Sequence, residues 1–314
     1  MIAKPKLTVI CVFVPALFLS LAWREWALSA EGGRLDAERI GKAADAKATT
    51  KGDVVRLEWA RDDVPVHVDG VLLKPFAGLG SWAAFAPAPH GAMMMGDTVV
   101  FEDEVAPAMD AAFSSGLEVT ALHNHFFYDE PKVFFMHIGG HGDPEQLAAG
   151  VKNVWNAIKK TRREHATPAR AFGGEAPREG KIDAAAIEKL LGHKSQSKDG
   201  VVKVSVGREG MMHQVKVGES MGLNTWAAFS GSDERAVVDG DFIMAGHEVQ
   251  PVLKALRKEG IHIVALHNHM IGEQPAFFFL HFWGKGPTRE LAQGVKTALD
   301  AQQAAKTRGV AESR

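Results

Sequence analysis

Six histidines in two matching clusters are the residues of this sequence best suited to metal chemistry. They are His123, His125 and His137 in the first cluster, and His267, His269 and His281 in the second. Residues two apart on a β-strand project from the same face, so the first two histidines of each cluster share a side. Neutral imidazoles are common ligands of transition metals.

The third histidine of each cluster follows a turn and a second predicted strand. A hairpin centred on Glu130 places His123 directly opposite His137, with Cβ atoms roughly 4.5–5.5 Å apart. The same arrangement pairs His267 with His281. Three imidazoles and one open position suit a catalytic zinc ion, and also copper or iron. We therefore expect a divalent transition metal in each cluster, zinc first and copper or iron next.

Two glutamates, Glu104 and Glu248, are repeated carboxylates at predicted helix starts. Either could supply an oxygen ligand or act as the general base of a metal-dependent hydrolase. The alternative is structural, because an acid in the first helical turn complements the helix dipole.

The histidines also have alternative interpretations. They could donate hydrogen bonds within a non-catalytic binding site for a small molecule or an envelope ligand. They could instead form a hydrogen-bonded polar face of a structural envelope protein. Methionines near Met94 and Met211 are potential copper(I) ligands, although methionine is more often core filler.

Both clusters belong to an internal repeat with an offset of 144 residues. Sixteen of the 33 positions are identical between residues 120–152 and 264–296. The offset also pairs Trp82 with Trp226, and Gly96-Asp97 with Gly240-Asp241. Residues 31–166 and 181–314 are therefore predicted to be two repeat domains, joined by a Pro- and Gly-rich linker at 167–180.

Hydrophobic periodicity assigns secondary structure to each repeat. Strands are expected at 54–59, 66–73, 201–206, 262–269 and 276–283, and a helix at 248–258. Asp143 and Pro144 form the start of a further helix. The mixed order predicts an α+β fold, in which each copy is a mostly antiparallel sheet with helices packed on one face.

The N-terminus has the pattern of a secretory signal peptide. Lys4 and Lys6 precede an apolar run, and small residues follow up to Ala30. We expect cleavage of residues 1–30 and a periplasmic or secreted protein, which contacts the membrane only through this segment if it is uncleaved. Pro15 argues against a straight spanning helix. The only cysteine, Cys11, lies in the same segment.

Composition narrows the class of partner. Charged residues make up 24 % of the 314 residues and the formal net charge is −2, so the chain lacks the basic character of a nucleic-acid-binding protein. We predict no nucleic-acid partner.

Three segments resemble the bacterial family of domains of unknown function numbered 1259, which includes the LppY/LpqO-like lipoproteins. These segments are 71–76 (VLLKPF), 81–85 (SWAAF) and 121–127 (ALHNHFF), the last of which has a counterpart in the second repeat. The resemblance covers nearly all of the chain after residue 30. It implies an exported bacterial protein with a duplicated domain and supplies no activity. The chain lacks the lipid-acceptor cysteine of the lipoprotein members, which favours a soluble periplasmic form.

Overall fold

The computed structural model describes residues 34–312, so the predicted signal peptide lies outside the described part of the chain. Each unit begins with a short helix, α2 (Ala37–Ala44) or α5 (Ala184–Leu191). Asp36 and Asp183 cap these helices by accepting hydrogen bonds from backbone N–H groups of the first turn.

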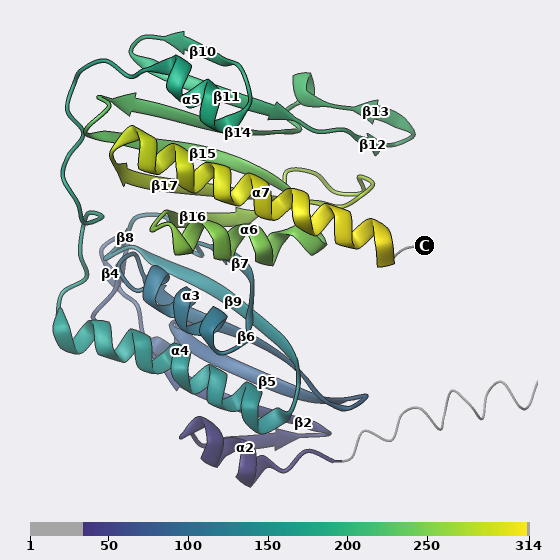
Figure 1. Ribbon diagram of the computed structural model, residues 1–314. Coiled ribbons are helices and arrows are strands. Elements are labelled where there is room, and N and C mark those ends of the chain that lie inside the picture. The colour runs from purple at the N-terminus through teal and green to yellow at the C-terminus, as the bar shows by residue number, and fades with distance from the viewer. Residues whose placement is uncertain (1–33, 313–314) are drawn as a thin grey trace, which may run out of the picture.

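The two units form one 12-stranded sheet in the order β1-β2-β5-β6-β9-β7-β16-β17-β15-β14-β11-β10 (Figure 1). In the first unit its strands are β1 (Ala48–Lys51), β2 (Val54–Ala60), β5 (Gly80–Ala88), β6 (Gly91–Phe101), β7 (Glu118–His123) and β9 (Val133–Gly142). In the second unit they are β10 (Ser195–Lys198), β11 (Val201–Gly207), β14 (Asn224–Gly231), β15 (Ala236–Ala245), β16 (His262–His267) and β17 (Phe277–Gly286). The two halves have the same strand order and meet at the pair β7–β16.

The longer helices cover one face of this sheet, as Figure 1 shows. They are α3 (Val105–Ser114), α4 (Pro144–Glu164), α6 (Gly246–Lys258) and α7 (Thr288–Glu312). Asp143 caps α4 and Pro144 is its first residue, as predicted. Alternate strand residues such as Leu122, Met136 and Leu266 are buried against the helices, in one core that includes residues of both units. The α+β fold with two tandem copies is thus confirmed.

The opposite face of the sheet has only small additional elements. In the first unit β3 (His67–Val68), β4 (Val71–Leu72) and β8 (Asp129–Glu130) make a three-stranded sheet. In the second unit β12 (Gly210–Met212) pairs with β13 (Val215–Val217). Short 3₁₀ turns at Pro75–Ala77 and Glu219–Met221 complete the fold. Each addition covers a small apolar cluster and leaves the sheet centre uncovered by helices.

No helix in the described part of the chain has both the length and the apolar character needed to cross a membrane.

Candidate metal centre

Both histidine clusters lie on the sheet face opposite the helices. Leu122 and Leu266 point into the helix-covered core, so the next residues, His123 and His267, project from the other face. His137 and His281 lie on the neighbouring strands β9 and β17. The fold therefore brings together the three predicted histidines of each cluster.

The predicted direct opposition of His123 and His137 is wrong by two residues. His123 lies across from Phe135, and His137 lies across from Ala121. A β-bulge between Val119 and Ala121, together with a wide connection through β8, replaces the tight hairpin that we assumed. The second unit has the same shift. A shift of two residues preserves the face, so the histidines still converge.

In the first cluster two imidazoles are in direct contact. The Nε2 atoms of His123 and His137 are 3.1 Å apart. The ring of His125 stacks on Phe135, with centroids 3.3 Å apart, and its centroid is 5.2 Å from that of His123. Two nitrogens bound to a tetrahedral zinc ion, each at roughly 2.0–2.1 Å, would themselves be about 3.3 Å apart. The contact pair therefore has nearly the spacing of two zinc ligands.

In the second cluster a different pair is in contact. The Nε2 atoms of His267 and His269 are 3.2 Å apart. His281 stacks on His267 with centroids 5.0 Å apart, and its Nδ1 lies 3.3 Å from the carbonyl oxygen of Gly240. Each cluster thus holds two histidine nitrogens at ligand spacing, with the third ring adjacent.

Sequence reasoning missed one residue of each cluster, Asp97 on β6 and Asp241 on β15. They lie across from His137 and His281 in the paired strands. Asp97 Oδ1 is 3.9 Å from His137 Nε2, and Asp241 Oδ2 is 3.6 Å from His269 Nε2. The repeated Gly-Asp pair was the available signal, because it recurs at the same offset as the histidines.

These aspartates are buried but not fully hydrogen-bonded. Asp97 is 8 % exposed and Asp241 is 5 % exposed, and the Oδ1 atom of each has no hydrogen-bond partner. Burial raises the pKa of both carboxyl groups, and the three neighbouring histidines partly offset this effect. A buried carboxylate oxygen without a partner is costly unless something else satisfies it.

Protonation of the histidines follows from the same partial burial. Burial lowers the pKa of His125, His267 and His269, although the nearby aspartate acts in the opposite direction. The neutral imidazole, which has a free lone pair, is the form that binds metal ions.

As they stand, the side chains do not complete a coordination sphere. Among residues 34–312, no group of three or more histidine, aspartate, glutamate or cysteine side chains has the geometry of a metal site. What the residues present is a donor set of three imidazoles and one carboxylate on adjacent strands, with two nitrogens at ligand spacing.

The predicted glutamates occupy a different environment. Glu104 is completely buried and bonds both terminal nitrogens of Arg61, at 2.9 and 3.0 Å. It also contacts Arg162 Nε at 2.7 Å and accepts a hydrogen bond from the Phe101 N–H. These contacts support the structural alternative for Glu104.

Glu248 is equally buried. It pairs with Arg208 and accepts hydrogen bonds from Gln302 and from the Ala245 N–H. Burial raises the pKa of Glu248, but the hydrogen bonds from Arg208 and Ala245 outweigh this, so the pKa lies below its ordinary value. Like Glu104, it anchors the start of a helix.

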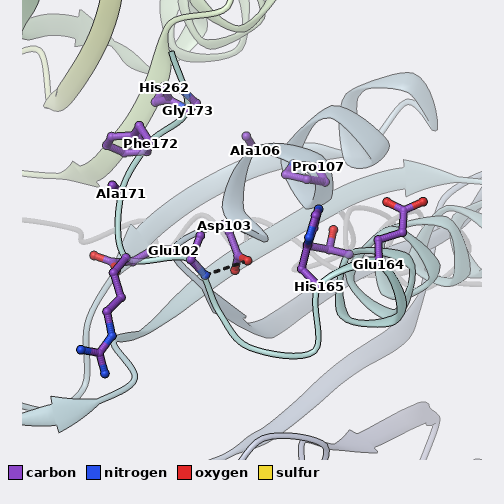
Figure 2. A pocket seen from close by; sticks show the side chains of 13 residues that line it. Glu102, Asp103, Ala106, Pro107, Glu164, His165, Ala171, Phe172, Gly173 and His262 are labelled. Atoms are coloured by element: carbon purple, nitrogen blue, oxygen red, sulfur yellow. Dashed lines mark hydrogen bonds between the residues drawn. The ribbon is translucent and has the colours of Figure 1, made fainter. Parts of the chain in front are cut away.

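A cavity of about 510 Å³ is lined by none of the residues of the two histidine clusters. Figure 2 shows its lining. It is formed between α3, the end of α4 and the linker, and its lining includes Asp103, His165, Phe172 and His262. Asp103 accepts hydrogen bonds from Arg162 and from the Ala169 N–H, which attaches the linker to the first unit. None of the six predicted ligands lines this cavity.

Comparison with known proteins identifies a family and no activity. Residues 38–157 and 185–301 match the family model described as Domain of Unknown Function (DUF1259). No curated protein matches the chain.

Solved structures similar to the chain are distant. They include EtuB from Clostridium kluyveri, with 12 % identity over 84 % of this chain and 93 % of that chain, and a TM-score of 0.21. The trimeric bacterial microcompartment shell protein PduB has 11 % identity over 84 % and 92 %, with a TM-score of 0.20. The double-ringed trimeric shell protein MSM0271 has 13 % identity over 69 % and 84 %, with a TM-score of 0.20.

Proposed function

The chain belongs to the family described as Domain of Unknown Function (DUF1259), and we propose that each of its two units binds one divalent transition-metal ion. In the first unit His123, His125, His137 and Asp97 hold the ion. In the second unit His267, His269, His281 and Asp241 hold it. Zinc is the first candidate, and copper or iron the next, because imidazole ligands suit all three.

The observation that carries this proposal is the orphaned oxygen of the buried aspartate in both units. Asp97 Oδ1 and Asp241 Oδ1 have no hydrogen-bond partner, although each side chain is almost fully enclosed. A cation bound between this carboxylate and the imidazoles would satisfy the oxygen. In the first unit the partnerless oxygen is also the one nearest a histidine, whereas in the second unit the oxygen nearest a histidine is the other one, Asp241 Oδ2. A buried aspartate with one unsatisfied oxygen next to three histidines in both diverged copies supports the same kind of ligand in each.

Completing the donor set requires a side-chain rotation of one histidine in each unit. The pair already at ligand spacing is His123–His137 in one unit and His267–His269 in the other. The two units therefore differ in which two of the three equivalent histidines are in contact. In the first unit the ring outside the pair is His125, which is exposed just beyond the end of β7, and in the second unit it is His281, which is half-buried on β17.

The chemistry would be that of a Lewis-acid centre. A bound zinc ion lowers the pKa of its water toward about 7 and so supplies a nucleophile for hydrolysis. We extend the proposal to a metal-dependent hydrolase in which neither glutamate acts as base, because Glu104 is paired with Arg61 and Arg162, and Glu248 with Arg208. Asp97 and Asp241 are the carboxylates beside the histidines.

The test is metal content by mass spectrometry of the purified chain without residues 1–30, followed by competitive zinc titration. We expect two equivalents per chain. Asp241→Asn and His281→Ala should each weaken binding in the second unit by roughly tenfold or more, and leave the first unit loaded.

Matched controls lie on the same sheet face. Asp239→Asn changes an exposed aspartate two residues from Asp241, and His141→Ala changes an exposed histidine four residues from His137. Both should retain two equivalents. A wild-type protein that takes up no zinc, copper or iron would refute the proposal and favour a hydrogen-bonded histidine network or a non-catalytic binding site for an envelope ligand.

Export is a separate proposal, based on the N-terminal sequence. We expect the chain to reach the periplasm or the medium after removal of residues 1–30. Fractionation of cells with N-terminal sequencing of the recovered protein tests this.

A further inference from the structure

The two candidate centres lie on neighbouring strands of one sheet, on either side of the junction between β7 and β16. We infer that they form a single binding face for one elongated ligand with an anionic group at each end. This inference rests on the metal binding proposed above and identifies the class of ligand that the two centres recognise together.

Strand register places the centres close to each other. Leu122 pairs with Leu266 across the junction of β7 and β16. In an antiparallel pair this sets Ala265 opposite His123 and Ala121 opposite His267. His123 and His267 are then diagonal neighbours, with Cα atoms roughly 7–8 Å apart, on the same face.

The outer histidines, His137 and His281, lie in line with these two residue pairs across the sheet. His137 lies across from Ala121, and His281 lies across from Ala265. Each outer histidine is therefore two strands from the nearest histidine of the other unit, which is about 10 Å at the usual strand spacing. These backbone separations exceed the roughly 3.5–4 Å between the ions of two-metal hydrolases, and the inferred ligand bridges the two centres through several atoms.

The floor between the centres is made of small side chains. Ala121 and Ala265 are half-buried and present only methyl groups. On the outer side each centre is bordered by a tryptophan, because Trp82 lies across from Asp97 and Trp226 across from Asp241. Alanine methyl groups therefore lie between the two centres, and the tryptophans lie on their outer sides.

Charge favours an anionic ligand. Three neutral imidazoles and one carboxylate do not neutralise a divalent ion, so each loaded centre retains positive charge. Carboxylate or phosphate groups are its natural ligands. A molecule that engages both centres also gains from the effective concentration of its second group.

The probe is a pair of eight-carbon acids with one or two carboxylates. Suberate and octanoate are titrated calorimetrically into the zinc-loaded wild-type chain, with metal content measured on the same sample. We expect suberate to bind on the order of a hundredfold more tightly than octanoate. Sebacate and succinate vary the distance between the carboxylates, and succinate should lose the gain because it is too short.

The decisive variant removes the second centre only. His267→Ala/His281→Ala should lower the zinc content from two equivalents to one and reduce the affinity for suberate to that for octanoate. His141→Ala, the control, should preserve both the metal content and the gain.

The outcomes separate the two proposals. Two bound zinc ions with equal affinity for suberate and octanoate would overturn the shared face and leave the metal centres standing. An absence of bound metal would overturn both.

Discussion

At the scale of single residues, hydrogen-bond satisfaction separates two kinds of buried carboxylate. Glu104 has an arginine or backbone N–H partner for each oxygen, whereas Asp97 has one oxygen with none. A satisfied carboxylate is held by the fold, while an unsatisfied one beside three imidazoles is available to a ligand. Residue type alone could not make this distinction, because the sequence offers both as repeated acids.

Glu104→Gln should therefore destabilise the protein without changing its metal content. The substitution removes the countercharge that Arg61 and Arg162 share, while Asp63 and Asp103 still pair with them. The loss should therefore not exceed the about 3–5 kcal/mol of a fully broken buried pair. Urea denaturation of wild type and variant measures this loss.

The matched control is Glu58→Gln, which removes an exposed carboxylate paired with Arg56. Exposed pairs contribute little, so stability should change by no more than about 1 kcal/mol. A stable Glu104→Gln protein that has lost its metal would reverse the assignment and make Glu104 a site residue.

The histidine trios show how far sequence reasoning reached at this scale. Alternation along a strand was sufficient to place His123 and His125 near His137. The exact pairing depended on the bulge at Thr120, which no residue pattern announces. Asp97 was missed because it comes from a strand remote in sequence, and only the register of β6 against β9 shows that it faces His137.

At the scale of elements, turn residues determined where a strand predicted from its apolar pattern is divided in two. The apolar pattern over residues 66–73 predicted one strand, but the structure has the short strands β3 and β4 joined by Asp69-Gly70. Both turn residues have positive φ, 49° and 77°, as a type I′ hairpin requires. The Asp-Gly pair was readable in the sequence and was outweighed by the apolar pattern.

The linker between the two units, residues 167–180, is held against β16 by an aromatic contact. Phe172 stacks on His262 with centroids 4.2 Å apart, and its carbonyl accepts a hydrogen bond from Lys285. Burial lowers the pKa of His262, Arg257 and Lys285 lower it further, and Asp110 opposes them. The folded protein thus disfavours the protonated ring.

Stability should consequently fall as the pH drops through about 6.5, the ordinary pKa of histidine, because the unfolded chain then binds a proton that the folded chain resists. His262→Gln removes this titration. The variant should lose less unfolding free energy than wild type between about pH 7 and pH 5. Parallel pH profiles for the two proteins would contradict the role assigned to His262.

At the scale of the whole molecule, the repeat predicted two alike units but not their union in one sheet. The pairing of β7 with β16 depends on two strand edges that meet in antiparallel fashion, and internal similarity says nothing about edges. Gln250 reinforces the junction by bonding both the N–H and the carbonyl of Val119. Arg257 on α6 also pairs with Asp110 on α3.

A shared sheet and a shared core predict that the two units unfold together. Separation would expose the edges of β7 and β16, and buried residues of both units belong to one apolar cluster. Calorimetry of the wild-type chain should show a single transition whose calorimetric and van't Hoff enthalpies agree.

Met109 and Leu253 occupy matching, fully buried positions in α3 and α6. Met109→Ala and Leu253→Ala should each cost about 2–5 kcal/mol and lower the same transition. Two transitions, each shifted by only one of the variants, would instead mean that the units are independent bodies, and the face shared by the two histidine clusters would lose its structural basis.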